Sequence, residues 1–559
     1  MSEQKQSFPT RLVVAVAIAV GISGAYFYFR GAFVSGSNPE DSAKVVPDEA
    51  FMAAYLVNDR QPWQKLSEFG NAESKAAIAR GIESFKNEVF TANNLDYDRD
   101  LKPWVGNIML AWLPAEEGAE PTETQSELLA VVGIKNPLRA WLFQRNLKSQ
   151  ENLKQQEIEY NGVTISEIIP SEGAPSYYTR LKNQLVLSDS RATVERAIDV
   201  FQGEPSLVAK TLGGSQEKSF KKLLSDDLGV DDPLFHFYLP DYGSMIGAVD
   251  RGLAESPVAL PETNAVQAIA IAGGVDNRGI YVRAISAVDP NLRPEQSEPI
   301  SGKLLDRLPS ETIALVSGAP LAQTWSSLVA QSQTSPPIEQ FVTLVRTAVN
   351  QFVNINADRD LFGWMDGEFA IGLVASQEGM LSQIGFGGAL LFETSDRTTA
   401  ATTLNKLENL AQNGLPFALE ISSRTVNGID FQDWRIPQQG AVVSYGWLDD
   451  NTVLLTLGGP IADAIAAGPS PSLRNSDNFG AIAGSLPTPN YGYFYLDMER
   501  AIDPLQTLLL FSGGNIPAGT TAILQSIRGI GVTATWPQPE QAEMELLFAL
   551  KKTKEFQGN

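Results

Sequence analysis

Two amphipathic helices are predicted from the spacing of apolar positions, and the same short polar stretch follows each. Apolar residues recur every three or four positions over 72–91 and over 338–352, which is the period of a helix with one buried face. Asp-Arg-Asp-Leu comes soon after each helix, with a tryptophan three residues further on, at 98–104 and again at 358–364. The two copies are 260 residues apart at the aspartate and at the tryptophan. An internal repeat of this kind indicates a duplicated unit.

The first unit is predicted to combine short strands with helices. A helix begins at Pro137, where proline suits the first turn, and another covers 193–201. The turn pair Asn161-Gly162 introduces one of the strands. Apolar runs predict strands at 51–57, 108–113, 128–134, 163–169, 185–187, 234–239, 265–273 and 280–287.

The second unit repeats this order. Asn427-Gly428 follows Asn161-Gly162 by 266 residues, and Phe494-Tyr495-Leu496 follows Phe237-Tyr238-Leu239 by 257. Helices are predicted at 397–411 and 461–467, and strands at 312–316, 369–374, 385–392, 453–457, 494–496, 529–536 and 543–550. We therefore expect an α+β fold, built by tandem duplication of two similar units with mostly antiparallel sheets and flanking helices, at 48–290 and 305–555.

A membrane anchor is predicted at the N-terminus. Residues 12–29 carry no charge and are mostly apolar, and as a helix they would span roughly 27 Å, close to the thickness of a bilayer core. Lys5 and Arg11 lie in the tail 1–11, so the positive-inside rule places this tail in the cytoplasm. Residues 30–47 form a linker, and the bulk of the chain is then periplasmic or thylakoid-lumenal. A cleaved signal peptide and a buried core helix are the alternatives.

The charge balance and the rarest residues exclude several classes of function. The 559 residues include 42 basic and 65 acidic ones, for a formal net charge of −23, which repels nucleic acid. The absence of cysteine excludes disulfides, thiolate zinc sites, iron–sulfur clusters and thiol nucleophiles. His236 is the only histidine, so a histidine-rich metal centre is excluded as well. No cofactor is expected.

The repeated stretch is a candidate calcium loop, because alternating oxygen-bearing side chains suit a hard cation. The candidate ligands are Asp96, Asp98 and Asp100 in the first copy, and Asn356, Asp358 and Asp360 in the second. A calcium loop needs glycine at its sixth position and glutamate at its twelfth, where this chain has leucine and then asparagine or glycine.

We favour a structural role for this stretch. The aspartates would cap a short turn, the leucine and tryptophan would fill the core, and the glycine would admit the next strand. The residues of this repeat motif are Asp98, Asp100, Leu101, Trp104 and Gly106, and Asp358, Asp360, Leu361, Trp364 and Gly367.

Other motifs do not assemble a catalytic site. Ser215 and Ser219 each begin a Ser-x-x-Lys match, but the elements that accompany this motif in penicillin-recognising enzymes are missing. Gly529 begins a dinucleotide-like glycine pattern inside a predicted strand, whereas that motif needs a strand-to-helix turn. His236 lies between two phenylalanines in a strand, where a packed residue is the usual outcome. No pair of carboxylates stands out among the 65 acidic residues.

The chain resembles cyanobacterial membrane-anchored proteins of domain-of-unknown-function family 3352 (DUF3352). The resemblance is carried by the N-terminal span, the acidic cysteine-free region after it, and Asp-Leu-x-x-Trp-x-Gly before an apolar strand. In the second copy the glycine falls one place later, at Gly367. The resemblance implies no settled activity.

We expect a membrane-anchored binding or scaffold protein that acts outside the cytoplasm, on another membrane protein or complex. An extracytoplasmic hydrolase using carboxylates or a Ser/Lys pair is one alternative. A lipid or small-molecule carrier that holds its ligand between sheet and helices is the other.

Overall fold

The computed structural model describes residues 38–556, apart from internal gaps at 90–95, 115–125, 149–152, 171–173, 213–214, 225–227, 244, 246–264, 290–297, 334, 377, 379–384, 414–418, 439 and 512–515. The chain divides into two compact units. Unit 1 contains residues 1–292, 537–543 and 552–559, and unit 2 contains 293–536 and 544–551.

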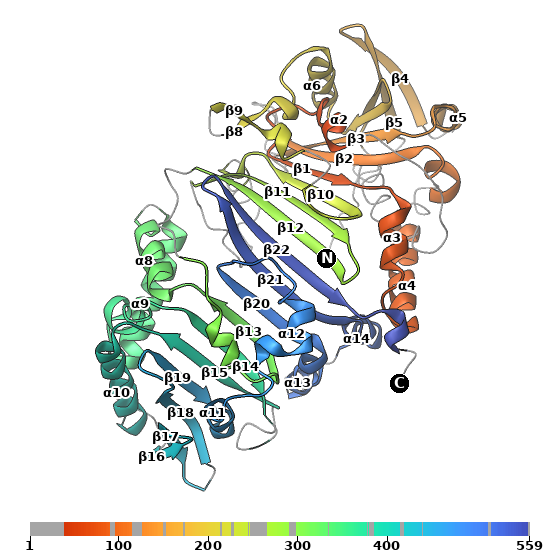
Figure 1. The fold of residues 1–559 in the computed structure, drawn as a ribbon. Coiled ribbons are helices and arrows are strands. Elements are labelled where there is room, and N and C mark those ends of the chain that lie inside the picture. The colour runs from red at the N-terminus through yellow and green to blue at the C-terminus, as the bar shows by residue number, and fades with distance from the viewer. Residues whose placement is uncertain are drawn as a thin grey trace, which may run out of the picture. The chain divides into compact units, whose positions relative to one another are not determined.

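Unit 1 is built on an antiparallel sheet with the strand order β12-β11-β10-β1-β2-β3-β7-β6-β5-β4 (Figure 1). Its strands are β1 (Met52–Leu56), β2 (Val105–Pro114), β3 (Ser126–Ile134), β4 (Leu153–Tyr160), β5 (Val163–Pro170), β6 (Ser176–Leu181), β7 (Gln184–Ser188), β10 (Pro233–Leu239), β11 (Val266–Val275) and β12 (Gly279–Val288). The short pair β8 (Thr211–Leu212) and β9 (Ser215–Ser219) forms a separate hairpin.

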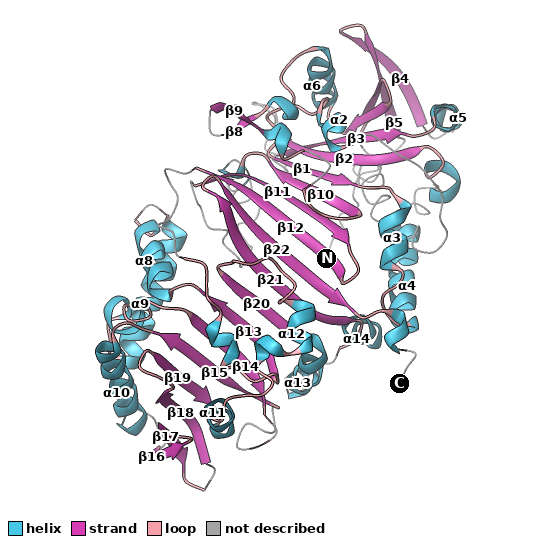
Figure 2. Cartoon of the chain, viewed as in Figure 1, coloured by secondary structure: helices cyan, strands magenta, loops and turns pink. Residues whose placement is uncertain are grey.

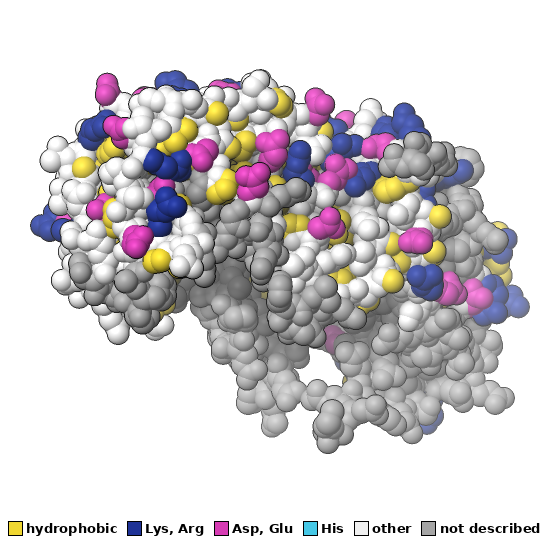
Figure 3. Space-filling view, turned by 90° about the horizontal axis from the view of Figure 1, so that it is seen from below, with side chains coloured by type: hydrophobic (Ala, Val, Ile, Leu, Met, Phe, Trp, Pro, Cys, Tyr) yellow, Lys and Arg dark blue, Asp and Glu magenta, His cyan; other side chains and the backbone are white. Residues whose placement is uncertain are grey.

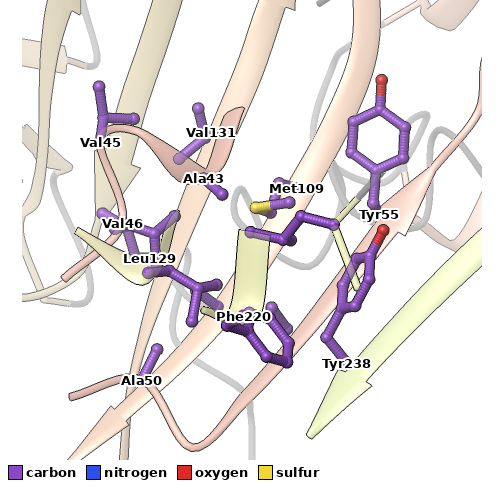
Figure 4. Packing of buried hydrophobic residues seen from close by; sticks show 14 of the residues in the cluster. Ala43, Val45, Val46, Ala50, Tyr55, Met109, Leu129, Val131, Phe220 and Tyr238 are labelled. Carbon is purple, nitrogen blue, oxygen red and sulfur yellow. The ribbon is translucent and has the colours of Figure 1, made fainter. Parts of the chain in front are cut away.

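The central strands β2 and β3 of unit 1 are largely apolar, and most of their side chains are buried on both faces. Successive side chains of a strand point to opposite faces, so Met109 and Leu110 of β2 enter two different hydrophobic clusters. The cluster around Met109 includes Phe220 and Tyr238, and Figure 4 shows these side chains packed together beside Tyr55. The helices are α2 (Pro39–Ala43), α3 (Arg60–Leu66), α4 (Ala72–Val89), α5 (Pro137–Lys148) and α6 (Arg191–Gln202).

Unit 2 contains an antiparallel sheet with the strand order β21-β20-β13-β14-β15-β19-β18-β17-β16. Its strands are β13 (Thr312–Gly318), β14 (Phe369–Ala375), β15 (Phe386–Glu393), β16 (Glu420–Val426), β17 (Ile429–Ile436), β18 (Gly440–Trp447), β19 (Thr452–Leu457), β20 (Gly492–Asp497) and β21 (Ile527–Gln538). The last strand, β22 (Gln541–Leu550), is divided between the two units after Glu543.

Helices accompany the sheet of unit 2 (Figure 2). They are α8 (Leu321–Gln331), α9 (Pro336–Val353), α10 (Arg397–Asn413), α11 (Gly459–Ala466), α12 (Asp477–Ile482), α13 (Met498–Phe511) and α14 (Ala518–Gln525). Trp325 of α8 packs in one cluster with Ile338 and Val342 of α9, and Leu404 of α10 packs with Trp364 and Tyr445 in another. The spacing of Ile338 and Val342 is that of one helix face, which is why this segment is helical.

The α+β class and the antiparallel sheets predicted from the sequence are confirmed. The strands β4, β6, β16, β17 and β18 and the short pair β8–β9 were not predicted. In β4, β6, β16 and β17, polar residues interrupt the apolar positions. The expected second unit, 305–555, is also different in its last residues. Lys552 pairs with Phe69, and the Thr553 N–H donates to the Glu68 carbonyl at 2.8 Å, so residues 552–559 group with unit 1.

The expected transmembrane segment, 12–29, lies outside the described residues. In the part of the chain that the structure describes, none of the helices combines the length and apolarity needed to cross a bilayer. On the face drawn in Figure 3, the described acidic and basic side chains alternate, and neither sign gathers into one large patch.

Candidate functional site

The first copy of the repeated stretch forms a single turn of π-helix, Tyr97–Leu101. The Arg99 N–H donates to the Asp96 side chain at 3.0 Å, and the Asp96 N–H donates to the Asp100 side chain at 2.9 Å. The Arg99 guanidinium donates one hydrogen bond to each carboxylate oxygen of Asp100, both at 2.7 Å. This fork lowers the pKa of Asp100, because a nearby cation favours the ionised carboxylate.

The second copy forms the same kind of turn, Ala357–Phe362, with matching hydrogen bonds. The Arg359 N–H donates to the Asn356 side chain at 2.9 Å, and the Asn356 N–H donates to Asp360 at 3.2 Å. Arg359 and Lys406 donate to the Asp360 carboxylate at 2.7 and 3.1 Å. The Arg359 hydrogen bond, followed by the one from the Asn356 backbone, holds the pKa of Asp360 well below its usual range.

The tryptophans of both copies are anchored by these turns. The Trp104 indole N–H donates to the Asp100 carbonyl at 2.7 Å, and the Trp364 indole N–H donates to the Asp360 carbonyl at 3.1 Å. Both rings are buried. The Gly367 N–H donates to the Glu393 carbonyl at 3.1 Å, and a Cβ at Gly367 would lie 2.6 Å from the Glu393 Cβ.

The two leucines of the repeat motif differ in burial: Leu101 is buried, and Leu361 is partly buried against the core of unit 2. Gly106 is buried, and its carbonyl accepts a hydrogen bond from the Asn58 side chain at 3.3 Å. The Asp358 carboxylate accepts from the Trp325 indole at 2.8 Å and from Arg346 at 3.0 Å. The Asp98 side chain lies outside what the structure describes. Each carboxylate whose side chain is described therefore already accepts from protein donors, either within its own turn or from α8, α9 and α10.

Metal binding at these residues stays a hypothesis. A cation at either turn would have to displace an arginine from its carboxylate, which costs a charge-assisted hydrogen bond. Among the residues that the structure describes, no three histidine, aspartate or glutamate side chains gather in a way that could hold a metal ion.

The first copy also borders a cavity of about 610 Å³ in unit 1. Leu101 and Trp104 contribute to one part of its wall, and α5 contributes Ala140, Trp141 and Phe143. The sheet supplies the rest, with Val132, Ile134, Ser166, Ile168, Tyr178, Leu185 and Leu187 among the lining residues. The volume and the predominance of apolar side chains are typical of small-molecule sites.

A few polar groups interrupt the apolar wall. Tyr178 is only 7% exposed, and its hydroxyl accepts from the side-chain amides of Gln144 at 3.2 Å and Gln155 at 2.7 Å. The Thr179 hydroxyl donates to a backbone carbonyl, that of Thr164, at 2.9 Å. The cavity can therefore hold an apolar body and orient it at one buried polar point.

The wall of the cavity reaches the outer surface at α5, as it also does at the exposed lining residues Glu157 and Gly162. Trp141 lines the cavity and yet is 51% exposed, so its ring belongs to the wall and to the outer surface at once. The Arg145 guanidinium lies 5.6 Å from the centroid of this ring. Leu138, on the preceding turn, is 66% exposed. An apolar ligand that enters here meets an apolar surface before it reaches the interior.

Charged groups near the cavity are few. Lys135 follows the lining residue Ile134, and its backbone N–H donates to the Trp104 carbonyl at 2.9 Å. Burial, and secondarily the neighbouring Lys102, lowers the pKa of Lys135 to about 8. Among the described residues that line the cavity, only Glu157, Arg180 and Tyr178 are ionisable, and the charges of Glu157 and Arg180 are opposite.

The other motifs noted in the sequence contribute none of the described residues that line this cavity. His236 is 2% exposed, and burial lowers its pKa to about 4, so it is neutral and shielded from solvent at neutral pH. Gly529 and Gly531 lie within β21, as expected for a structural glycine pattern. The Ser215 and Ser219 side chains lie outside what the structure describes.

Only one part of the cavity wall was singled out from the sequence. Leu101 and Trp104 were singled out because their motif occurs twice. Tyr178 and Gln144 were missed because β6 was not predicted and because α5 was assigned no role. A comparison of the two copies beyond their shared motif would have been the signal for these residues.

The comparisons with known proteins give a family but no activity. The family model described as "Protein of unknown function (DUF3352)" matches residues 12–550. A search of curated proteins finds no match. Crystal forms III, IV and I of TP0453 are 12%, 11% and 13% identical to this chain, with TM-scores of 0.24, 0.24 and 0.22. These matches cover 46%, 45% and 46% of this chain and 81%, 81% and 80% of the other, and at such TM-scores they carry no argument.

Proposed function

We propose, for a chain that belongs to the DUF3352 family of proteins of unknown function, a non-catalytic role in which unit 1 binds an apolar small molecule or lipid. The observation that carries this proposal is the 610 Å³ cavity between α5 and the sheet. An apolar wall offers water few hydrogen bonds, so transfer of an apolar ligand from water into this space is favourable.

A hydrolase is not favoured by the geometry. The one histidine is buried in a strand and uncharged at neutral pH. Glu157 is the one carboxylate among the lining residues, whereas glycoside hydrolysis uses a pair. Binding without turnover agrees best with this arrangement.

The test is to identify what the full chain carries when it is purified. Solvent extraction followed by mass spectrometry should find an apolar compound in a fixed ratio to protein. Ile168→Trp fills the cavity, so the compound should no longer be recovered with the protein. Ile78→Trp adds the same ring on the exposed side of α4 and should leave the ratio of compound to protein unchanged. Equal recovery from both variants would contradict the proposal.

The two units are proposed to be copies of one module. The support is their common strand order, in which β1, β2, β3 and β7 of unit 1 correspond to β13, β14, β15 and β19 of unit 2. The tight turns at the tip of β4–β5 and of β16–β17 agree as well. Asn161 and Asn427 both have positive φ, at 48° and 50°, as type I′ turns require.

The membrane anchor and the extracytoplasmic location are part of the proposal and rest on residues 12–29. A cyanobacterial origin, with a periplasmic or thylakoid-lumenal location, rests on the family resemblance alone. A carrier of apolar molecules has reason to be tethered at a membrane, where such molecules are concentrated. A reporter that works only outside the cytoplasm should be active when it is fused to the C-terminus of the full chain. Activity of a reporter that works only in the cytoplasm, fused at the same place, would contradict this location.

A partner in the membrane is the second candidate, and one feature of unit 2 favours it. Val316 lies opposite both Ile371 and Phe494 on neighbouring strands, and all three side chains are exposed. Leu373 and Leu457 extend this face. Exposed apolar side chains on adjacent strands are typical of interaction surfaces. Crosslinking in native membranes should capture a reproducible partner, and recovery of the chain alone would contradict this role.

A further inference from the structure

The hydroxyl hydrogen of Tyr178 is not used in a hydrogen bond to any residue that the structure describes. A tyrosine hydroxyl provides one donor and two acceptor positions. Both acceptor positions are used, by Gln144 and Gln155. Among the residues that the structure describes, no acceptor receives the hydroxyl hydrogen. Since Tyr178 lines the cavity and is 93% buried, this hydrogen is available to a ligand inside it.

The donors around this point are uncharged. Tyr178, Gln144 and Gln155 provide no cation that would offset a buried carboxylate. The charged lining residues Glu157 and Arg180 are exposed, whereas Tyr178 is buried. Burying an unpaired ionised group is costly, whereas an uncharged carbonyl oxygen needs only one donor. The surroundings therefore suit an apolar chain that carries an uncharged carbonyl.

Unit 2 has a tyrosine at the corresponding position, but its hydroxyl is occupied. In unit 1, Tyr178 lies opposite Leu187, which lies opposite Ala130. In unit 2, Tyr445 lies opposite Leu455, which lies opposite Leu390. The Tyr445 hydroxyl donates to the Glu408 carboxylate of α10 at 2.6 Å, and burial followed by this bond raises the pKa of Tyr445 well above its usual range.

A larger side chain also stands where the cavity of unit 1 has Ile168. Ile168 lies two residues beyond the partner of Tyr178 on β5, and Trp434 lies two residues beyond the partner of Tyr445 on β17. The Trp434 ring packs against the Tyr445 ring, at 6.3 Å between centroids. Leu404 of α10 is buried in the same cluster.

We propose that unit 1 alone takes a ligand, and that this ligand is an uncharged acyl compound whose carbonyl oxygen accepts from the Tyr178 hydroxyl. The inference rests on the proposed function, because it assigns the chemistry of the same cavity. In the corresponding region of unit 2, Trp434 packs against Tyr445 and the Tyr445 hydroxyl is engaged by Glu408. An acyl ester is the simplest ligand of this class.

The test compares three probes of similar length by equilibrium dialysis with the full chain: methyl dodecanoate, tetradecane and dodecanoic acid. Tyr178→Phe should lower the affinity for methyl dodecanoate about fivefold, because one hydrogen bond is lost. The affinity for tetradecane should not change. Thermal unfolding checks that the variant is folded. In the wild type, the infrared carbonyl band of bound carbon-13-labelled ester should lie at a lower wavenumber than in an apolar solvent, which needs no variant.

The outcomes separate this inference from the proposed function. If Tyr178→Phe binds the ester as well as the wild type does, and the carbonyl band is unshifted, the acyl assignment is overturned. Dodecanoic acid binding more tightly than its methyl ester would overturn the choice of an uncharged ligand. If Ile168→Trp binds both the ester and tetradecane like the wild type, the cavity itself is not the binding site and the proposed function fails.

Discussion

The single histidine offers a sharp test of how unit 1 is packed. His236 lies on β10 between Tyr55 and Tyr238, at 5.9 and 6.1 Å between ring centroids. Its Nδ1 is buried and has no hydrogen-bond partner among the described residues. Protonation would place a charge in this apolar setting, and burial therefore lowers its pKa from 6.5 to about 4.

The magnitude follows from proton linkage. Between pH 6.5 and about 4 the unfolded chain binds the proton and the folded chain does not, so the free energy of unfolding falls as the pH is lowered through this window. The full penalty is about 3 kcal/mol, and about 2 kcal/mol of it is present at pH 5. Above pH 6.5 both states are neutral and the penalty is absent.

The assay compares the wild type with His236→Phe, which keeps an aromatic ring at this position and removes the titrating nitrogen. Unfolding of unit 1 in urea is monitored by hydrogen exchange at several pH values. It gives the difference in the free energy of unfolding between the two chains. This difference should be constant above pH 6.5 and should then move by about 2 kcal/mol in favour of the variant by pH 5. Carboxylates titrate in both chains and cancel.

A direct reading of the pKa is also available. Histidine-selective isotope labelling gives one imidazole signal, because the chain has one histidine. The signal should not titrate above pH 5. Titration near 6.5 would refute the packing of His236, and a pH-independent difference between the two chains would refute the linkage argument.

Two further predictions concern the second copy of the repeated stretch and are measured by urea unfolding. Asp360→Asn removes the charge that Arg359 and Lys406 pair with, and should lower the free energy of unfolding by about 1 kcal/mol at pH 7. Because the folded pKa of Asp360 is depressed, the difference should shrink as the pH falls below the usual range of aspartate, and a constant difference would contradict the pairing. Gly367→Ala should cost about 1 to 3 kcal/mol by overpacking. Its control, Gly81→Ala on α4, meets no atom within 4 Å and should stabilise by about 0.5 to 1 kcal/mol, and equal effects would refute the close packing at Gly367.

The sequence predicted most of the architecture because strands buried on both faces leave continuous apolar runs. β2 and β3 were predicted for this reason, and the helices α4 and α9 for their apolar period. β4 was missed, since Gln155, Gln156 and Glu157 interrupt its apolar positions. Its pairing with β5, directly across the Asn161-Gly162 turn, stabilises it as a strand, and this pairing outweighs the polar composition of the segment.

The candidate site was predictable only in part. Trp104 was recognised because its motif recurs as Trp364, and both tryptophans proved to be anchored in the same way. The cavity depends on what differs between the units, such as Ile168 where unit 2 has Trp434. A difference of this kind gains meaning only once strand register shows which residues correspond.

The measurement that tests the central claim most directly is the binding stoichiometry of methyl dodecanoate. One molecule should bind per wild-type chain, in unit 1, and none should bind to Ile168→Trp. No saturable binding to the wild type, or one molecule still bound after Ile168→Trp, would contradict it.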